Sequence, residues 1–350
     1  MKIGLITYHY SQNYGAVMQT YATCRILKEL GHEVEIINIR QPEKRKIRHV
    51  VFIPKYRNFD KFMNKFYPRQ TQIIHDANEL RQIDFDYDCL LVGSDQVWNP
   101  MISQDKCMVY FLDFGRQNVL RISYASSLGI NRWPDEKGYL LEDVSRALHN
   151  FNAISVREKT GQEILENIFK VKAQLVLDPT MLHSEYDEII CNLSETDNVV
   201  CYLLNRTKEQ LIVSRYISKQ LGKKAQLLTS VYPVYGFEYI YPPSIENWIR
   251  YIAGANLVIT DSFHGVVFSL LYKRNFIVIA VNNGRNSRLQ DLLKMLGLES
   301  RYFTSMKELT ESDIYMKNID YIQIDAVIKR NRDISIAFLF ESLKTLKDEN

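Results

Sequence analysis

The chain carries side chains suited to acid–base chemistry and anion binding directly after short apolar segments. His264 follows the apolar run Leu257–Ile259 and the triplet Thr260-Asp261-Ser262, ahead of a helix predicted over Val266–Tyr272. Imidazole exchanges protons near neutral pH, and the N-terminus of a helix favours anions. A histidine that only caps the helix is the alternative, and the local sequence leaves both open. Asp261 or Ser262 is the expected N-cap in either case.

Arg157 is the second candidate, because it follows the apolar run Ala153–Val156 and should project from the end of a strand. A planar guanidinium with five donors suits a carboxylate or a phosphate. The alternative is a surface arginine paired with Glu158 or another acid. On local sequence alone we favour the surface arginine.

The segment from Ser262 to Gln290 contains no Asp or Glu. A nucleotide-sugar site usually needs a carboxylate for the ribose hydroxyls, whereas an acid-free, basic segment suits a small anion of high charge. Lys273 is expected only to solvate a helix end. The cations of this segment are Lys273, Arg274, Arg285 and Arg288.

These residues need a framework of parallel strands and helices. Lys2–Thr7 reads as a strand, Ala16–Leu30 as a helix that Gly31 ends, and Glu33–Ile39 as the next strand. In open parallel sheets, ligands bind beyond the carboxyl ends of the strands. The polar residues expected there are His9, Gln12, Asn13, Ser94, Asp95, Ser126, Ser127 and Arg157 in the first half, and Asp261, Ser262, His264, Asn282, Asn283, Arg285 and Arg288 in the second.

The strand–helix alternation predicts an α/β protein of two Rossmann-like domains with parallel sheets, arranged as in GT-B transferases with a cleft between them. A polar, irregular segment at 179–198 suggests the boundary. We therefore predict an N-terminal domain over 1–182, a C-terminal domain over 183–330 and a C-terminal helix over 331–350.

Composition and motifs exclude several classes of protein. A net charge of +3 does not indicate binding to nucleic acid, and neither a dinucleotide fingerprint nor a P-loop occurs. No metal-ligand spacing is present, so we expect no metal. Five widely spaced cysteines without C-x-x-C, and the lack of a signal peptide or an apolar span, predict reduced thiols and a cytoplasmic location.

The stretch from Arg40 to Arg69 is different in charge, with ten Lys/Arg against Glu43 and Asp60. Its aromatic residues alternate with the cations. Such a stretch could face anionic lipid headgroups or a pyrophosphate-linked glycolipid. We favour the alternative of a solvated insertion whose aromatic rings pack on their own domain.

Several blocks in order resemble the polysaccharide pyruvyl transferase family over nearly the whole chain. The resemblance implies a GT-B-like fold and transfer of a pyruvyl group from phosphoenolpyruvate to a sugar of a surface polysaccharide such as a capsule, usually as a ketal. The blocks are Ile3–Thr7 with Asn13–Ala16, Leu91–Asn99, Tyr124–Gly129, Ile154–Glu158, Leu177–Pro179, Ile259–Gly265, and Arg288 ahead of Leu296–Leu298.

The resemblance also implies roles for single residues. Positions matching Arg157 and His264 belong to the donor site, and some relatives carry a lysine at the position of Arg288. We expect Arg157 and Arg288 to clamp phosphoenolpyruvate with Arg285 in reserve, and His264 to move a proton or neutralise the departing phosphate. Asp95 is the candidate base for the sugar hydroxyl. Ser262, Asn13 and Ser94 are further expected substrate contacts.

No cofactor is expected besides the donor substrate phosphoenolpyruvate. The resemblance leaves open whether the acceptor is lipid-linked and whether the chain contacts the inner face of the membrane. Two other functions stay open at this point: a GT-B glycosyltransferase that uses a nucleotide sugar, and a non-catalytic relative that binds glycans.

Overall fold

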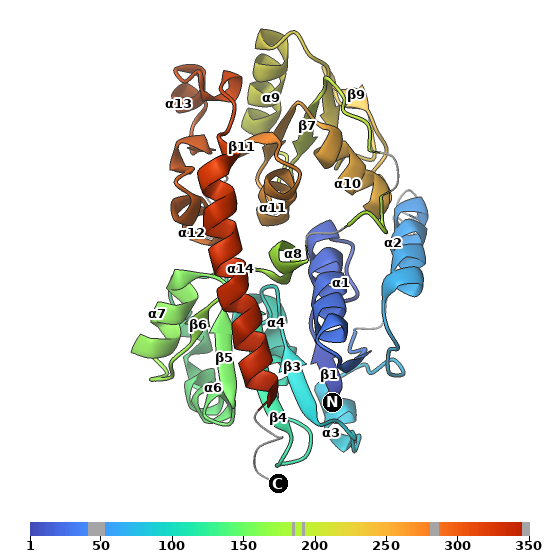
Figure 1. The fold of residues 1–350 in the computed structure, drawn as a ribbon, viewed down its shortest axis with the longest axis vertical. Helices are drawn as coiled ribbons and strands as arrows, with labels where there is room; N and C mark the ends of the chain where they lie inside the picture. The colour runs from blue at the N-terminus through green and yellow to red at the C-terminus, as the bar shows by residue number, and fades with distance from the viewer. Residues whose placement is uncertain (41–52, 184–185, 191–192, 281–286, 345–350) are drawn as a thin grey trace. The chain divides into compact units, whose positions relative to one another are not determined.

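A computed structural model describes residues 1–40, 53–183, 186–190, 193–280 and 287–344, with Tyr139 described by its backbone alone. The chain forms two compact units (Figure 1). The first unit comprises Met1–Lys44, Phe66–His183 and Lys329–Asn350, and the second comprises Arg45–Lys65 and Ser184–Ile328. These units are groups of residues in mutual contact and do not test whether each part folds by itself. The predicted domain boundaries near 182 and 330 therefore stay a prediction.

The first unit is built on a six-stranded parallel sheet with the strand order β2-β1-β3-β4-β5-β6. Its strands are β1 (Lys2–Ile6), β2 (Glu33–Ile36), β3 (Cys89–Val92), β4 (Leu120–Ser126), β5 (Ala153–Val156) and β6 (Gln174–Leu175). Its α-helices are α1 (Tyr14–Glu29), α3 (Ala77–Gln82), α4 (Pro100–Ser103), α5 (Cys107–Tyr110), α6 (Leu141–Leu148), α7 (Lys159–Asn167) and α8 (Pro179–Leu182).

The second unit repeats this architecture, with the strand order β12-β11-β10-β7-β8-β9, again all parallel. Its strands are β7 (Val199–Tyr202), β8 (Ala225–Leu227), β9 (Glu238–Tyr239), β10 (Leu257–Thr260), β11 (Asn275–Ile279) and β12 (Tyr302–Phe303). Its helices are α2 (Ile53–Phe66, of which the residues to Lys65 belong here), α9 (Lys208–Gln220), α10 (Ile245–Gly254), α11 (Phe263–Leu271), α12 (Ser287–Leu296) and α13 (Met306–Thr310). The last helix, α14 (Tyr321–Lys344, red in Figure 1), continues from this unit into the first.

The central strands are buried along their whole length, as in β3, β7 and β10. Strands of a parallel sheet covered on both faces have no solvent side, and so the sequence shows continuous apolar runs instead of alternation. This is why the strands could be located in the sequence. The predicted α/β fold with two parallel sheets is confirmed.

Each sheet has one point at which the strand order reverses. In the first sheet β3 lies on one side of β1 and β2 on the other. In the second sheet β10 lies on one side of β7 and β8 on the other. The connections leave in opposite directions at such a switch point, which opens a crevice at the carboxyl ends of the two strands. Residues that directly follow β1, β3, β7 and β10 therefore lie nearest to the two crevices.

Two features differ from the sequence predictions. The short strands β9 and β12 were not predicted, because two residues carry no periodicity. Helix α11 begins at Phe263 instead of Val266. In the basic stretch, the described aromatic residues Phe59 and Phe62 are buried.

Each unit has its own apolar core. Trp98 stacks on Phe111 in the first unit and donates its indole N–H to the carbonyl of Tyr110 at 2.7 Å. Trp248 packs edge-on against Tyr202 and Phe268 in the second. The four described cysteines are buried free thiols, and Cys191 lies outside the described residues. Among the helices described, none combines the length and the apolar character needed to cross a bilayer.

Candidate active site

Asp261 joins the two strands at the switch point of the second sheet. Its carboxylate accepts the backbone N–H groups of Leu204 and Asn205, which follow β7, at 2.7 and 3.0 Å, and the side-chain amide of Gln210 at 3.2 Å. Ser262, not Asp261, is the N-cap of α11, with its hydroxyl accepting from the Gly265 N–H at 3.4 Å. Asp261 thus stabilises the crevice and is occupied by protein donors.

Gly265 allows the tight turn from β10 into α11. A Cβ atom at this position would lie 2.4 Å from the hydroxyl oxygen of Thr260. That hydroxyl donates to the carbonyl of Tyr202 on β7 at 2.7 Å and accepts from the N–H of Ser262 at 3.0 Å. The short side chains of this segment are therefore required by close packing at the switch point.

His264 is the second residue of α11 and lies inside the first helical turn. The sequence had placed it before the helix; the cap at Ser262 starts the helix three residues earlier than the apolar spacing suggests. Its side chain is 6% exposed and packs edge-on against the ring of Phe263, with 5.2 Å between ring centres. The imidazole therefore sits at a helix N-terminus beside the switch point, where anions are favoured. The structure does not assign it the part of N-cap, which belongs to Ser262.

Arg288 is the only one of the predicted clamp residues in this unit that the described ranges include. Its guanidinium lies over the ring of Phe263, 5.9 Å from the ring centre, and the neighbour of Phe263 in sequence is His264. Arg285, Asn282 and Asn283 lie outside the described residues. Arg288 and His264 therefore flank the same aromatic ring.

The other two cations of the acid-free segment point elsewhere. Lys273 pairs with Asp325 at 2.6 Å, and Arg274 pairs with Glu195 at 2.7 Å. Both follow the C-terminal end of α11, a full helix length from Ser262. Lys273 and Arg274 therefore form ion pairs beyond the C-terminal end of α11, away from its N-terminus.

Arg157 follows β5 as predicted, but its side chain is completely buried. It donates through Nη1 to Asp178 and to the hydroxyl of Ser94 (3.2 Å), and through Nη2 to Asp95 at 3.2 Å. Burial lowers the pKa of Arg157, but the charges of Asp178, Asp95 and Glu158 outweigh this effect and raise the pKa above its ordinary value. The alternative of a surface arginine paired with Glu158 or another acid is wrong about exposure: Arg157 belongs to a cluster of one buried cation and the three carboxylates of Asp95, Glu158 and Asp178.

Two buried carboxylates of this cluster were not among the predicted site residues. Asp178 accepts from both the backbone N–H and the hydroxyl of Thr180 with its second oxygen, at 3.0 and 2.6 Å. Glu158 accepts from the Ser127 hydroxyl and from the N–H groups of Leu128 and Gly129, at 2.8–3.1 Å. The sequence did offer a signal for both residues, because each follows a predicted strand. Glu158 comes directly after Arg157 behind β5, and Asp178 comes directly before Pro179 behind β6.

The side chains of Asn13 and Ser94 both hydrogen-bond to other groups of the protein. The Asn13 side chain caps α1 by accepting from the N–H groups of Gly15 and Ala16 at 2.9 and 3.3 Å. The hydroxyl of Ser94, which is fully buried, donates to Asp178 at 3.0 Å and accepts from Arg157. Their predicted role as substrate contacts stays a prediction.

The switch point of the first sheet also holds polar atoms without a protein partner. The hydroxyl of Tyr8 and the amide oxygen of Gln12 follow β1, are shielded from solvent, and have no hydrogen-bond partner among the described residues. The Tyr8 ring lies 5.0 Å from that of Tyr110, and burial, together with the nearby charge of Asp95, raises the pKa of both phenols. Buried polar atoms of this kind are normally satisfied by water or a ligand.

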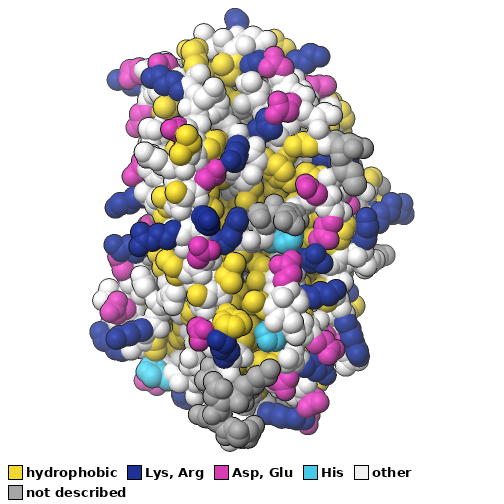
Figure 2. Space-filling view, in the orientation of Figure 1, with side chains coloured by type: hydrophobic (Ala, Val, Ile, Leu, Met, Phe, Trp, Pro, Cys, Tyr) yellow, Lys and Arg dark blue, Asp and Glu magenta, His cyan; other side chains and the backbone are white. Residues whose placement is uncertain are grey.

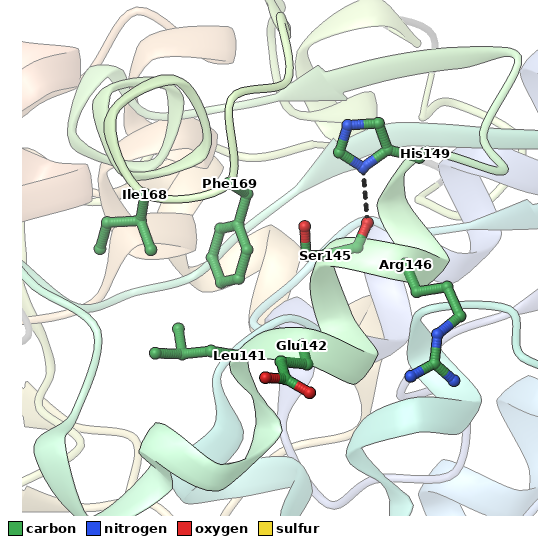
Figure 3. Close-up of a pocket in the computed structure, with 7 residues that line it drawn as sticks. All are labelled: Leu141, Glu142, Ser145, Arg146, His149, Ile168 and Phe169. Atoms are coloured by element: carbon green, nitrogen blue, oxygen red, sulfur yellow. Dashed lines mark hydrogen bonds between the residues drawn. The ribbon is translucent and has the colours of Figure 1, made fainter.

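A pocket of about 540 Å³ lies elsewhere in the first unit, between α6 and the end of α7 (Figure 3). His149 and Phe169 line it, and both precede a strand instead of following one. The ring of His149 is held by the carbonyl of Ser145 at 2.7 Å. The pocket therefore lies away from the switch point. Within the described ranges no group of three or more His, Cys, Asp or Glu side chains is arranged to hold a metal ion.

The family model described as polysaccharide pyruvyl transferase matches residues 13–283, which is most of the chain. The chain belongs to the polysaccharide pyruvyl transferase family. The matched range includes the blocks around Asp95, Arg157, Asp178 and His264. The opening strand and Arg288 fall outside it, and so the resemblance proposed for those two blocks is not tested. Among curated proteins, none matches the sequence significantly.

This pyruvyl transferase family member shares its fold with solved epimerases and glycosyltransferases. A provisionally assigned UDP-N-acetylglucosamine 2-epimerase from Listeria monocytogenes is similar with a TM-score of 0.61 at 11% identity, covering 100% of this chain and 97% of that one. The Neisseria meningitidis UDP-GlcNAc 2-epimerase bound to UDP-GlcNAc gives 0.59 at 10% identity, with 99% and 100% covered. A glycosyltransferase from Rickettsia africae gives 0.53 at 12% identity, with 100% and 99% covered.

Proposed function

We propose that this family member transfers a pyruvyl group from phosphoenolpyruvate to a sugar of a surface polysaccharide or its precursor and forms a pyruvate ketal. Membership of the family supports a transferase that acts on a polysaccharide. The observation that carries the finer proposal is the placement of His264 in the first turn of α11, with the Arg288 guanidinium over the adjacent Phe263 ring. An imidazole and a guanidinium at a helix N-terminus suit a small anion with two acidic groups.

The reaction needs three proton transfers and the loss of phosphate. One sugar hydroxyl gives up its proton and adds to the central carbon of phosphoenolpyruvate, while a proton is delivered to the methylene carbon, which becomes a methyl group. Phosphate then leaves, and a second hydroxyl of the same sugar closes the ketal with loss of its proton. His264 is the candidate for one transfer, or for neutralising the departing phosphate as imidazolium. Arg288 is the candidate clamp for the donor, with Arg285 in reserve.

The first unit is proposed to bind the acceptor. Asp95 is the partly exposed member of the carboxylate cluster, with 17% of its side chain accessible, whereas Asp178 and Glu158 are fully buried. Only Asp95 can therefore reach a sugar hydroxyl, and Arg157 holds it through the bond at 3.2 Å. In this geometry the donors of Arg157 are directed at carboxylates. Its direct contact with phosphoenolpyruvate stays a prediction.

Phosphoenolpyruvate is the only small molecule that this proposal requires, and no cofactor is invoked. The acceptor is proposed to be a polysaccharide precursor at the cytoplasmic face of the membrane, where a lipid-linked sugar would be accessible. Nucleic acid has no part in the proposal.

Release of inorganic phosphate from phosphoenolpyruvate in the presence of candidate glycans tests the proposal. We expect phosphate release that depends on the acceptor, together with a product heavier by one ketal-linked pyruvate in mass spectrometry. Turnover of a nucleotide sugar without consumption of phosphoenolpyruvate would make the chain a glycosyltransferase. Glycan binding without turnover of either donor would make it a non-catalytic relative.

A further inference from the structure

Helix α2 presents a line of cations to solvent. Arg57, Lys61 and Lys65 are all exposed and are spaced four residues apart, so they lie on one face, about 6 Å apart along the helix axis. We call these three residues the cationic stripe. Phe59, Phe62 and Met63 occupy the opposite face and are buried. The helix is therefore anchored by its apolar side and displays its charge outward.

The cationic stripe is unfavourable for the helix itself. Like charges four residues apart repel each other, by about 0.2–0.5 kcal/mol per pair. Other helices of the chain place opposite charges at this spacing: Arg25 with Glu29 on α1, Lys159 with Glu163 on α7, and Lys307 with Glu311 on α13, at 3.8–3.9 Å. An opposing anionic surface would compensate the repulsion between Arg57 and Lys61, beside which the helix carries the single acid Asp60.

Aromatic and apolar groups adjoin the first turn of α2. The backbone of Lys55 hydrogen-bonds Tyr241, and the phenol groups of Tyr239 and Tyr56 are near enough to that of Tyr241 to help raise its pKa. Tyr239 is 48% exposed and Ile53, the first residue of α2, is 39% exposed. Tyrosine is favoured at the depth of lipid headgroups, because its ring is apolar and its hydroxyl is polar.

We infer that the cationic stripe, with Tyr239 and Ile53 beside it, binds the surface of a membrane rich in anionic phospholipid. The phosphates of the headgroups supply the negative charge opposite Arg57 and Lys61, and the apolar side chains enter the interface. Figure 2 shows Lys and Arg side chains at the edge of the molecule where Figure 1 places α2. The inference concerns a surface of the second unit and does not depend on pyruvyl transfer.

Co-sedimentation with sucrose-loaded vesicles tests this inference on the full chain. We expect the wild type to pellet with vesicles of phosphatidylcholine and phosphatidylglycerol, to stay in solution with phosphatidylcholine alone, and to be released by salt. The double variant Arg57→Gln/Lys61→Gln should lose roughly 30-fold in the partition coefficient, since each cation near the surface contributes about a factor of five or more.

The matched control removes two exposed cations from another helix of the same unit, Lys208→Gln/Lys219→Gln on α9. This control should bind vesicles like the wild type. Equal binding of the wild type to both kinds of vesicle, or equal loss in the two double variants, would overturn the inference. So would competition by soluble glycerol phosphate at the phosphate concentration of the vesicles, which would indicate an ordinary anion site.

The same variants separate this inference from the proposed function. Acceptor-dependent phosphate release from phosphoenolpyruvate, measured with a soluble glycan, should be equal in the wild type and in Arg57→Gln/Lys61→Gln. If no variant consumes phosphoenolpyruvate and vesicle binding still depends on Arg57 and Lys61, the proposed function fails and the membrane surface stands. If phosphate is released but the wild type ignores anionic vesicles, the membrane surface fails alone.

Discussion

The guanidinium of Arg157 donates to the carboxylate of Asp178, and both side chains are completely shielded from solvent. Asp178 also receives the hydroxyl of Ser94, which itself accepts from Arg157. These contacts link the residues that follow β3, β5 and β6 into one buried network. A residue expected to bind substrate is thus held in place by the protein itself.

Asp178→Asn should destabilise the protein by about 3 kcal/mol, because it leaves the buried Arg157 with one compensating charge fewer. Chemical denaturation measures the loss. Asp143→Asn is the matched control, since Asp143 forms an exposed pair with Arg146 on α6, and exposed pairs contribute about 1 kcal/mol or less. A small and equal loss in the two variants would show that the buried pair adds nothing to stability.

His264→Gln should reduce acceptor-dependent phosphate release by about 100-fold or more, as expected for loss of a general acid or base, while the thermal transition changes little. Ser262→Ala should instead lower the stability of the protein more than it lowers turnover. It removes the N-cap of α11 and costs about 1 kcal/mol of stability. A large loss of stability in His264→Gln with unchanged turnover would assign His264 a structural role.

Tyr8→Phe should leave the protein as stable as the wild type or slightly more stable, because the removed hydroxyl is buried without a partner in the described structure. If the hydroxyl binds the acceptor sugar, the KM for the acceptor should rise while the KM for phosphoenolpyruvate stays constant. Initial rates at varied concentrations of each substrate separate the two. Unchanged values of both constants would remove Tyr8 from the acceptor site.

Stability should depend on pH through His9. Burial lowers the pKa of His9, in spite of hydrogen bonds to Asn38 and to the carbonyl of Thr7. Below the unfolded-state pKa of about 6.5 the unfolded chain therefore binds a proton that the folded chain does not. The stabilisation from His9 is complete above that pH and is lost as the pH falls, by up to about 1.4 kcal/mol per unit.

His9→Gln should flatten this dependence. The free energies of unfolding of the wild type and the variant, measured by denaturation between pH 7 and about pH 5.5, should converge as the pH falls. Identical slopes in the two proteins would mean that His9 does not titrate differently on unfolding. The carboxylates titrate equally in both proteins, and so their contribution cancels.

The sequence predicted the central strands well, because these depend on local patterns. β5 has the bounds of the predicted apolar run Ala153–Val156, and Arg157 follows it as expected. The start of α11 was placed three residues late, because Phe263 and His264 directly follow the polar triplet Thr260-Asp261-Ser262 and only the Ser262 cap shows that the helix has begun. β9 and β12 were missed because their pairing partners are distant in sequence.

By itself the sequence determined the α/β class, the family and the residues that follow each strand, since apolar runs and short motifs are properties of neighbouring residues. Only the tertiary structure decided which of these residues meet. Asp178 became a partner of Arg157 because parallel pairing aligns the carboxyl ends of β5 and β6, and a buried guanidinium requires carboxylates close by. The same long-range packing made Ser262 the cap and left Asp95 as the accessible carboxylate.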